Sequence, residues 1–117
     1  MNLQFDINFL DSIVTYALKG KITTENDFEE LEREVFENLN KNFYRIIFDL
    51  SELTHTNSSG IGFFMRTLTK ARIMNGDLAL IHLNGNVQKI FEIAKLDEVY
   101  TIYTEEEKAI KHFKQTQ

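Results

Sequence analysis

The sequence contains no cysteine and no proline, and only five of its 117 residues are glycine. Without cysteine, disulfide bonds and thiolate catalysis are excluded, and the composition agrees with a reducing compartment. No apolar run approaches the roughly 20 residues that a membrane-spanning helix needs. The N-terminus has no basic segment followed by an apolar one, so we expect no secretory signal. These absences predict a cytoplasmic protein with no membrane partner.

Concentrated positive charge is also missing. The net charge is −5, and the 13 lysines and arginines are scattered along the chain. Because phosphate backbones are bound by clustered basic side chains, we expect no nucleic-acid partner. The three histidines, His55, His82 and His112, do not have the spacing of metal ligands. No Walker-type loop and no Gly-x-Ser-x-Gly elbow is present, so the sequence predicts no metal, no cofactor and no enzymatic activity.

What the chain does contain is a core-forming composition. Hydrophobic residues make up 43% of it, and ten phenylalanines supply large apolar surfaces. A chain of this length holds one hydrophobic core, so we expect a single domain over residues 1–117.

Hydrophobic periodicity predicts an alternation of strands and helices. Apolar residues alternate with polar ones at the N-terminus, as in a half-buried strand, and later segments repeat at the helical period. The predicted strands are 3–9, 13–18, 44–50, 78–83 and 99–103, and the helices are 24–40, 58–75, 87–95 and a last one that begins after Thr104. Residues 51–57 are predicted to be a loop. This order predicts an α/β fold whose sheet is mostly parallel, with an opening antiparallel hairpin and about four helices.

The most informative segment runs from Asp49 to Gly62, from the end of a buried strand into the start of a helix. Functional groups gather at the carboxyl ends of strands in such sheets. A helix N-terminus also favours a bound or covalent phosphate, and Ser58 stands there. The residues alone leave a purely structural interpretation open, in which Asn57 or Ser58 caps the helix and the glycines permit close packing.

The run Asp-Leu-Ser-x-Leu-x-x-x-Asn-Ser-Ser-Gly-Ile-Gly at 49–62 resembles the signature of STAS domains, specifically of the anti-sigma factor antagonists. The resemblance spans nearly the whole chain. It includes Gly20-Lys21-Ile22, the helix end at Asn75-Gly76, and the segment 87–91. It implies a single STAS-type domain.

In that family, a partner anti-sigma factor of the GHKL ATPase type is also a serine kinase. It phosphorylates the first serine of the turn, which corresponds to Ser58, and a phosphatase reverses the modification. The unphosphorylated antagonist binds the anti-sigma factor and frees the sigma factor. The resemblance therefore implies a regulator of transcription, a monomer that forms heterocomplexes with these two partners.

Two positions differ from many antagonists, which carry aspartate where this chain has Asn57 and Thr23. We expect the partner to contact the start of the second helix and its outward face. We expect that face to carry Phe63 as an exposed anchor, with Phe64, Met65 and Leu68 in the core. The expected contact residues are Thr23, Asn57, Ser58, Ser59, Gly60, Ile61, Phe63, Arg66, Thr67 and Lys70.

Two alternatives stay open. One is a STAS scaffold or small-ligand sensor without a phosphorylation switch. The other is a receiver-like domain phosphorylated at Asp49. A receiver needs an acidic pair after its first strand to hold Mg²⁺, and this chain offers only Asp11 there.

Overall fold

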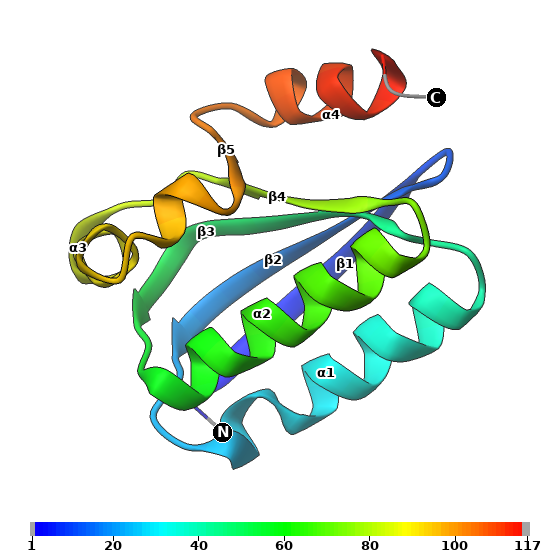
Figure 1. The fold of residues 1–117 in the computed structure, drawn as a ribbon. Coiled ribbons are helices and arrows are strands. Elements are labelled where there is room, and N and C mark those ends of the chain that lie inside the picture. Colours follow the sequence, from blue (N-terminus) through cyan, green and yellow to red (C-terminus); the bar gives the residue numbers. More distant parts are fainter. Residues whose placement is uncertain (1, 116–117) are drawn as a thin grey trace.

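The computed structural model describes residues 2–115, which form one α/β domain (Figure 1). Its elements follow the order predicted from periodicity, with one added turn of 3₁₀ helix, η1. The strands are β1 (Leu3–Leu10), β2 (Ile13–Lys21), β3 (Arg45–His55), β4 (Asp77–Ile81) and β5 (Thr101–Tyr103); the helices are α1 (Glu25–Asn40), α2 (Ser58–Ile73), α3 (Gly85–Ile93), η1 (Leu96–Glu98) and α4 (Glu106–Gln115).

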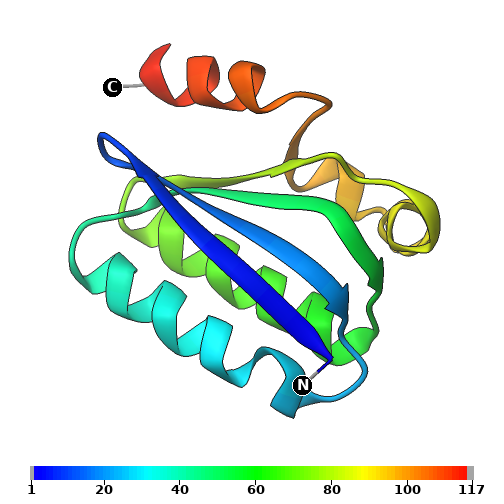
Figure 2. The same cartoon turned by 180° about the vertical axis from the view of Figure 1, so that it is seen from behind.

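The five strands form one sheet in the order β1-β2-β3-β4-β5. β1 and β2 are an antiparallel hairpin, and the other neighbours are parallel, as expected from the sequence. Figures 1 and 2 show α1 and α2 side by side under one face of the sheet, while α4 lies over the opposite face. The carboxyl ends of β3, β4 and β5 therefore lead to helices that are divided between the two faces.

Aromatic side chains connect the elements of the larger core, which lies between the sheet and the α1–α2 layer. The ring of Phe63 stacks on Phe28 of α1 and on Phe48 of β3, with centroid distances of 5.1 and 5.8 Å. The series continues through Phe64 to Phe91 of α3, at 5.9 Å. α3 thus contributes to the same core as α1 and α2.

A smaller core lies on the opposite face, beneath α4. Its apolar centre is formed by Ala109 and Phe113 of α4 against Ile47, Ala79 and Ile81 of the sheet. Of the β1 residues on this face, Gln4, Asp6 and Asn8 are polar and exposed. None of the described helices is long and apolar enough to cross a membrane.

The structure corrects the predicted loop at 51–57. β3 continues to His55 because β2 is also longer than expected, and its end pairs with the second half of β3 at Gly20↔Leu53 and Lys21↔His55. The polarity that suggested a loop has a simple cause. β4 pairs only with the first half of β3, as far as Asp49, so the second half lies beyond the neighbouring strand and is mostly exposed.

The later elements are shorter than predicted. β5 begins at Thr101 rather than at residue 99, because the chain first makes the 3₁₀ turn of η1. β4 ends at Ile81, since His82 takes a left-handed backbone conformation with φ 57° and leaves the sheet.

Candidate functional site

The start of α2 is fixed by Asn57, which is its N-cap. The side-chain Oδ1 of Asn57 accepts a hydrogen bond from the Gly60 N–H at 3.1 Å, and its carbonyl oxygen accepts one from the Ile61 N–H at 2.9 Å. The side-chain bond pairs the Gly60 N–H, one of the groups that a helix start leaves unpaired, and the carbonyl bond is the first regular hydrogen bond of the helix. The structural role considered for Asn57 is therefore confirmed.

Asn57 also joins α2 to the loop between β2 and α1. Its Nδ2 donates to the carbonyl oxygen of Thr23 at 2.8 Å. Thr23 is itself held by Asp27, whose Oδ2 accepts from the Thr23 N–H at 2.8 Å and from the Thr23 hydroxyl at 2.9 Å. The hydrogen bond from the Thr23 N–H is the main reason why the pKa of Asp27 is lowered. The two positions that depart from the family pattern thus lie side by side.

Ser58 occupies the first position of α2 and is exposed. Its hydroxyl makes no hydrogen bond within residues 2–115. The helix contributes a partial positive charge at this end, which stabilises an anionic group there. Ser59 is half-buried, and Thr56 is only 9% exposed. Among the hydroxyls of this turn, Ser58 is the most accessible.

Gly60 has a packing role. A Cβ added at this position would overlap the Oγ1 of Thr56 and would lie 3.1 Å from the Cγ2 of Ile22. Glycine allows the first turn of α2 to sit directly on the β2 and β3 ends. Gly60 is buried, which agrees with the close packing considered for it, and its contact with a partner stays a prediction.

The predicted orientation of α2 is wrong for Phe63 and Thr67. Both are fully buried, and the inward face is Gly60, Phe63, Phe64, Thr67, Leu68 and Ala71. α1 and the sheet both approach from the side of Phe63, which stacks on rings from each of them. Thr67 is tolerated there because its hydroxyl donates to the carbonyl oxygen of Phe63 at 3.0 Å. Met65, which was predicted to be core, is only partly buried.

The remaining predicted contact residues of α2 lie at the surface. Ile61 is partly exposed, and Arg66 and Lys70 are exposed. Arg66 is oriented by a forked ion pair with Glu32 of α1, with Nε–Oε2 at 2.8 Å and Nη2–Oε1 at 3.1 Å. On this part of α2 the charge of Arg66 is therefore paired with α1, and the exposed Lys70 adds a second positive charge.

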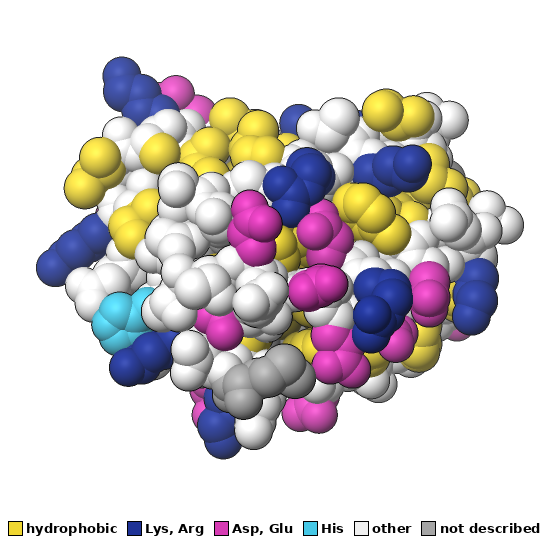
Figure 3. All heavy atoms as spheres, turned by 90° about the horizontal axis from the view of Figure 1, so that it is seen from below, with side chains coloured by type: hydrophobic (Ala, Val, Ile, Leu, Met, Phe, Trp, Pro, Cys, Tyr) yellow, Lys and Arg dark blue, Asp and Glu magenta, His cyan; other side chains and the backbone are white. Residues whose placement is uncertain are grey.

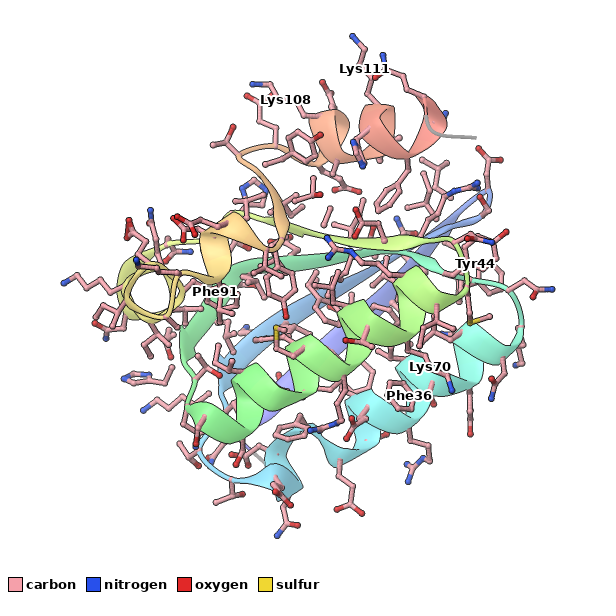
Figure 4. All side chains as sticks on the ribbon, in the orientation of Figure 1. Phe36, Tyr44, Lys70, Phe91, Lys108 and Lys111 are labelled. Carbon is pink, nitrogen blue, oxygen red and sulfur yellow. The ribbon has the colours of Figure 1, made fainter. Side chains whose placement is uncertain are left out.

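A hollow of about 360 Å³ between α1 and α2 was not predicted from the sequence. Its apolar walls are Phe36, Met65 and Ile73, and Arg66 and Lys70 stand at its edge. Figure 4 shows Phe36 and Lys70 next to one another between the two helices, and in Figure 3 apolar side chains reach the surface among charged ones on this side. The spacing of Met65 and Ile73, two helical turns apart, is the signal that could have revealed it.

Asp49, the residue of the receiver interpretation, is half-buried near the middle of β3. Its Oδ1 accepts a hydrogen bond from the Ser51 N–H at 3.0 Å. Within residues 2–115, no group of three or more histidine and acidic side chains is arranged to hold a metal ion. The geometry around Asp49 therefore offers no magnesium site of the receiver kind.

Comparison with known proteins agrees with this fold. The family model of the STAS domain matches residues 4–109. BtrV of Bordetella bronchiseptica, which carries the name of an anti-sigma factor antagonist, is 25% identical over 112 residues, covering 96% of each chain.

Solved structures give the same fold. A Thermotoga maritima protein described as an anti-sigma factor antagonist superposes with a TM-score of 0.82, at 23% identity and 94% coverage of both chains. The anti-sigma factor antagonist SpoIIAA in its unphosphorylated form gives a TM-score of 0.83, at 20% identity, covering 96% of this chain and 97% of that one. The Bacillus SpoIIAA in its phosphorylated form gives a TM-score of 0.74 at 20% identity, covering 93% of this chain and 98% of that one.

Proposed function

Because the chain belongs to the STAS domain family, we propose that it is an anti-sigma factor antagonist switched by phosphorylation of Ser58. The observation that carries the proposal is the exposed, unbonded hydroxyl of Ser58 at the N-terminus of α2. The relative BtrV supports the antagonist role by its name, and SpoIIAA supports the switch because it has been solved in both phosphorylation states. The expected partners are an anti-sigma factor that is also a GHKL-type serine kinase, and a phosphatase, in the cytoplasm.

The proposed binding surface begins at Thr23 and Ser58 and continues along the exposed side of α2. With Phe63 buried, the apolar hollow between α1 and α2 takes the place of the single aromatic anchor. Arg66 and Lys70 at its edge suit a partner surface that combines apolar and acidic side chains. The chain would act as a monomer that forms heterocomplexes.

A phosphate on Ser58 would add about −1.5 to −2 charges at neutral pH. The helix N-terminus accepts this charge without refolding, so the change stays local. A partner that meets the turn with acidic or apolar groups is then repelled or must desolvate the phosphate. Binding is lost although the fold is kept.

The test uses the full chain, its cognate kinase and ATP. Mass spectrometry should show one added phosphate in wild type and in Ser59→Ala, and none in Ser58→Ala. In binding assays, Ser58→Ala should bind the unmodified partner as wild type does, and Ser58→Asp should bind more weakly. Modification at Ser59 or Thr56, or equal binding by Ser58→Asp, would contradict the proposal.

A second function is favoured by Asn57 and Thr23, which stand where many antagonists carry aspartate. Removing two carboxylates beside Ser58 changes what a kinase can recognise, and it fits a STAS scaffold that binds partners without modification. Unchanged regulation by Ser58→Ala in the cell, with no phosphate on the wild-type protein, would support this scaffold role.

A further inference from the structure

The chain leaves the sheet in opposite directions after β4 and after β5. β4 leads into α3, whose Val87 and Phe91 belong to the core on the α1–α2 face. β5 leads into α4, whose Ala109 and Phe113 form the core on the other face. Figures 1 and 2 show this divergence at the end of the two strands. In open α/β sheets, connections that part to opposite faces leave a ligand-binding crevice outside the carboxyl ends of the strands.

A crevice of about 590 Å³ lies at this point. Its apolar walls include Leu83, which follows β4, and Ile102 and Tyr103 at the end of β5. The ring of Tyr103 is held in place by contact with the His112 ring, with a centroid distance of 5.8 Å. Small-molecule sites in proteins have volumes of about 300–1,000 Å³ and mostly apolar walls with a few polar groups. The crevice has this size and this lining.

Two of the polar side chains that line the crevice are acidic, and the other polar residues of its lining are His82, Asn84, Gln88 and Thr104. Glu92 of α3 and Asp97 of η1 line it, and the run Glu105–Glu107 lines an adjoining hollow that shares His82 with it. None of these five carboxylates makes an ion pair within the part of the chain that the structure describes. On α4, Lys108 and Lys111 project away from the sheet in Figure 4. Lys89 and Lys95 are near these residues in sequence but do not line the crevice. Because its lining contains two carboxylates and no lysine or arginine, the crevice favours a cation over a phosphate or carboxylate.

We propose that this crevice is a second binding site, and that it takes a small organic amine with an apolar body. The ammonium group contacts the carboxylates of Glu92 and Asp97, and the apolar body lies against Leu83, Ile102 and Tyr103. A cation near the face of Tyr103 gains a further favourable interaction with the aromatic ring. None of these residues belongs to α2 or to the Ser58 turn, so the site does not depend on the proposed function.

The test is a titration of the full-length, isotope-labelled chain, followed by backbone NMR shifts. The probes are 2-phenylethylamine and 3-phenylpropionate, which have similar shapes and opposite charges. The amine should shift the amides of residues 82–84, 88, 92, 97 and 102–104 saturably, with a Kd on the order of 1 mM, as expected for so small a ligand. The carboxylate should bind at least about tenfold more weakly because of the acidic groups. Equal binding of the two probes, or no saturable shift in these residues, would overturn the proposal.

Charge-removing variants complete the test. The double variant Glu92→Gln/Asp97→Asn keeps the shape of two exposed side chains, and it should weaken amine binding by about tenfold. Glu98→Gln, an exposed neighbour in η1 that does not line the crevice, is the matched control and should bind as wild type does. Ser58→Ala should also bind the amine normally, which separates this site from the switch. Undiminished binding by the double variant would show that the carboxylates do not hold the amine.

Discussion

The side-chain amide of Asn57 ties the start of α2 to Thr23, with its Nδ2 donating to the Thr23 carbonyl oxygen at 2.8 Å while its Oδ1 caps the helix. An aspartate at position 57 could cap the helix but could not donate to a carbonyl oxygen. In this chain the Asn57 amide therefore forms an uncharged bridge between the two segments. The loop that carries Thr23 and the turn that carries Ser58 are held as one unit.

The first prediction concerns this bridge. Asn57→Ala removes both the cap and the contact to Thr23, and it should lower the free energy of unfolding by about 0.5–2 kcal/mol, the range for lost helix caps. Urea unfolding of the purified chain measures this. Asn57→Asp keeps the cap but loses the bond to Thr23, so its free energy of unfolding should lie between those of wild type and Asn57→Ala. A stability of Asn57→Ala equal to wild type would contradict the role of the bridge.

The second prediction compares two glycines of α2. Gly60→Ala places a methyl group against Thr56 and Ile22, and overpacking of this kind costs about 1–3 kcal/mol. At Gly62 the nearest atom to a new Cβ is the Nη1 of Arg66 at 3.3 Å, at the far end of an exposed side chain that needs to shift only slightly, so Gly62→Ala should be tolerated. Thermal melts of the two variants measure the difference. Combining Gly60→Ala with Thr56→Ala should restore part of the loss; equal melting temperatures for the two single variants would show that Gly60 is not a packing requirement.

The third prediction separates core from surface on α2. Phe63→Ala should reduce stability by about 3–5 kcal/mol, since it removes a fully buried ring that stacks on two others. Ile73→Ala, at a residue that is 73% exposed, should leave stability nearly unchanged. Ile73→Ala also tests the hollow between α1 and α2, because Ile73 lines it. This variant should weaken binding of the cognate partner. A stable Phe63→Ala protein would place this ring outside the core.

The fourth prediction is a loss of stability in alkali. Burial raises the pKa of Tyr16 from 10.0 to about 12, although a hydrogen bond from Asn38 at 2.9 Å opposes the shift. Burial raises the pKa of Tyr100 as well. Above about pH 10 the unfolded chain loses these protons first, so the stabilisation is complete below that pH and declines as the pH rises toward 12. Urea unfolding at increasing pH should show the decline, and Tyr16→Phe should make it less steep. A flat profile to about pH 12 would contradict the burial of these hydroxyls.

The order of the elements was readable from the sequence because each element has a strong local signal. The alternation over residues 3–9 predicted β1, and Asn75-Gly76 predicted the end of α2, which the structure places at Ile73. Such patterns depend on neighbours within one turn or one strand, so a single sequence contains them. The same is true of Asn57 and Ser58, whose place at a helix start follows from local preferences for caps.

Only the tertiary structure decided which side of α2 is buried and where ligands can enter. The faces centred on Phe63 and on Met65 share Phe64, Leu68 and Ala71, and the sequence does not say from which direction α1 approaches. The length of β3 depends on the far end of β2, and the crevice depends on α3 and α4 lying on opposite faces. These features arise from contacts between segments far apart in the chain, and their energies exceed the local preferences that a sequence pattern reports.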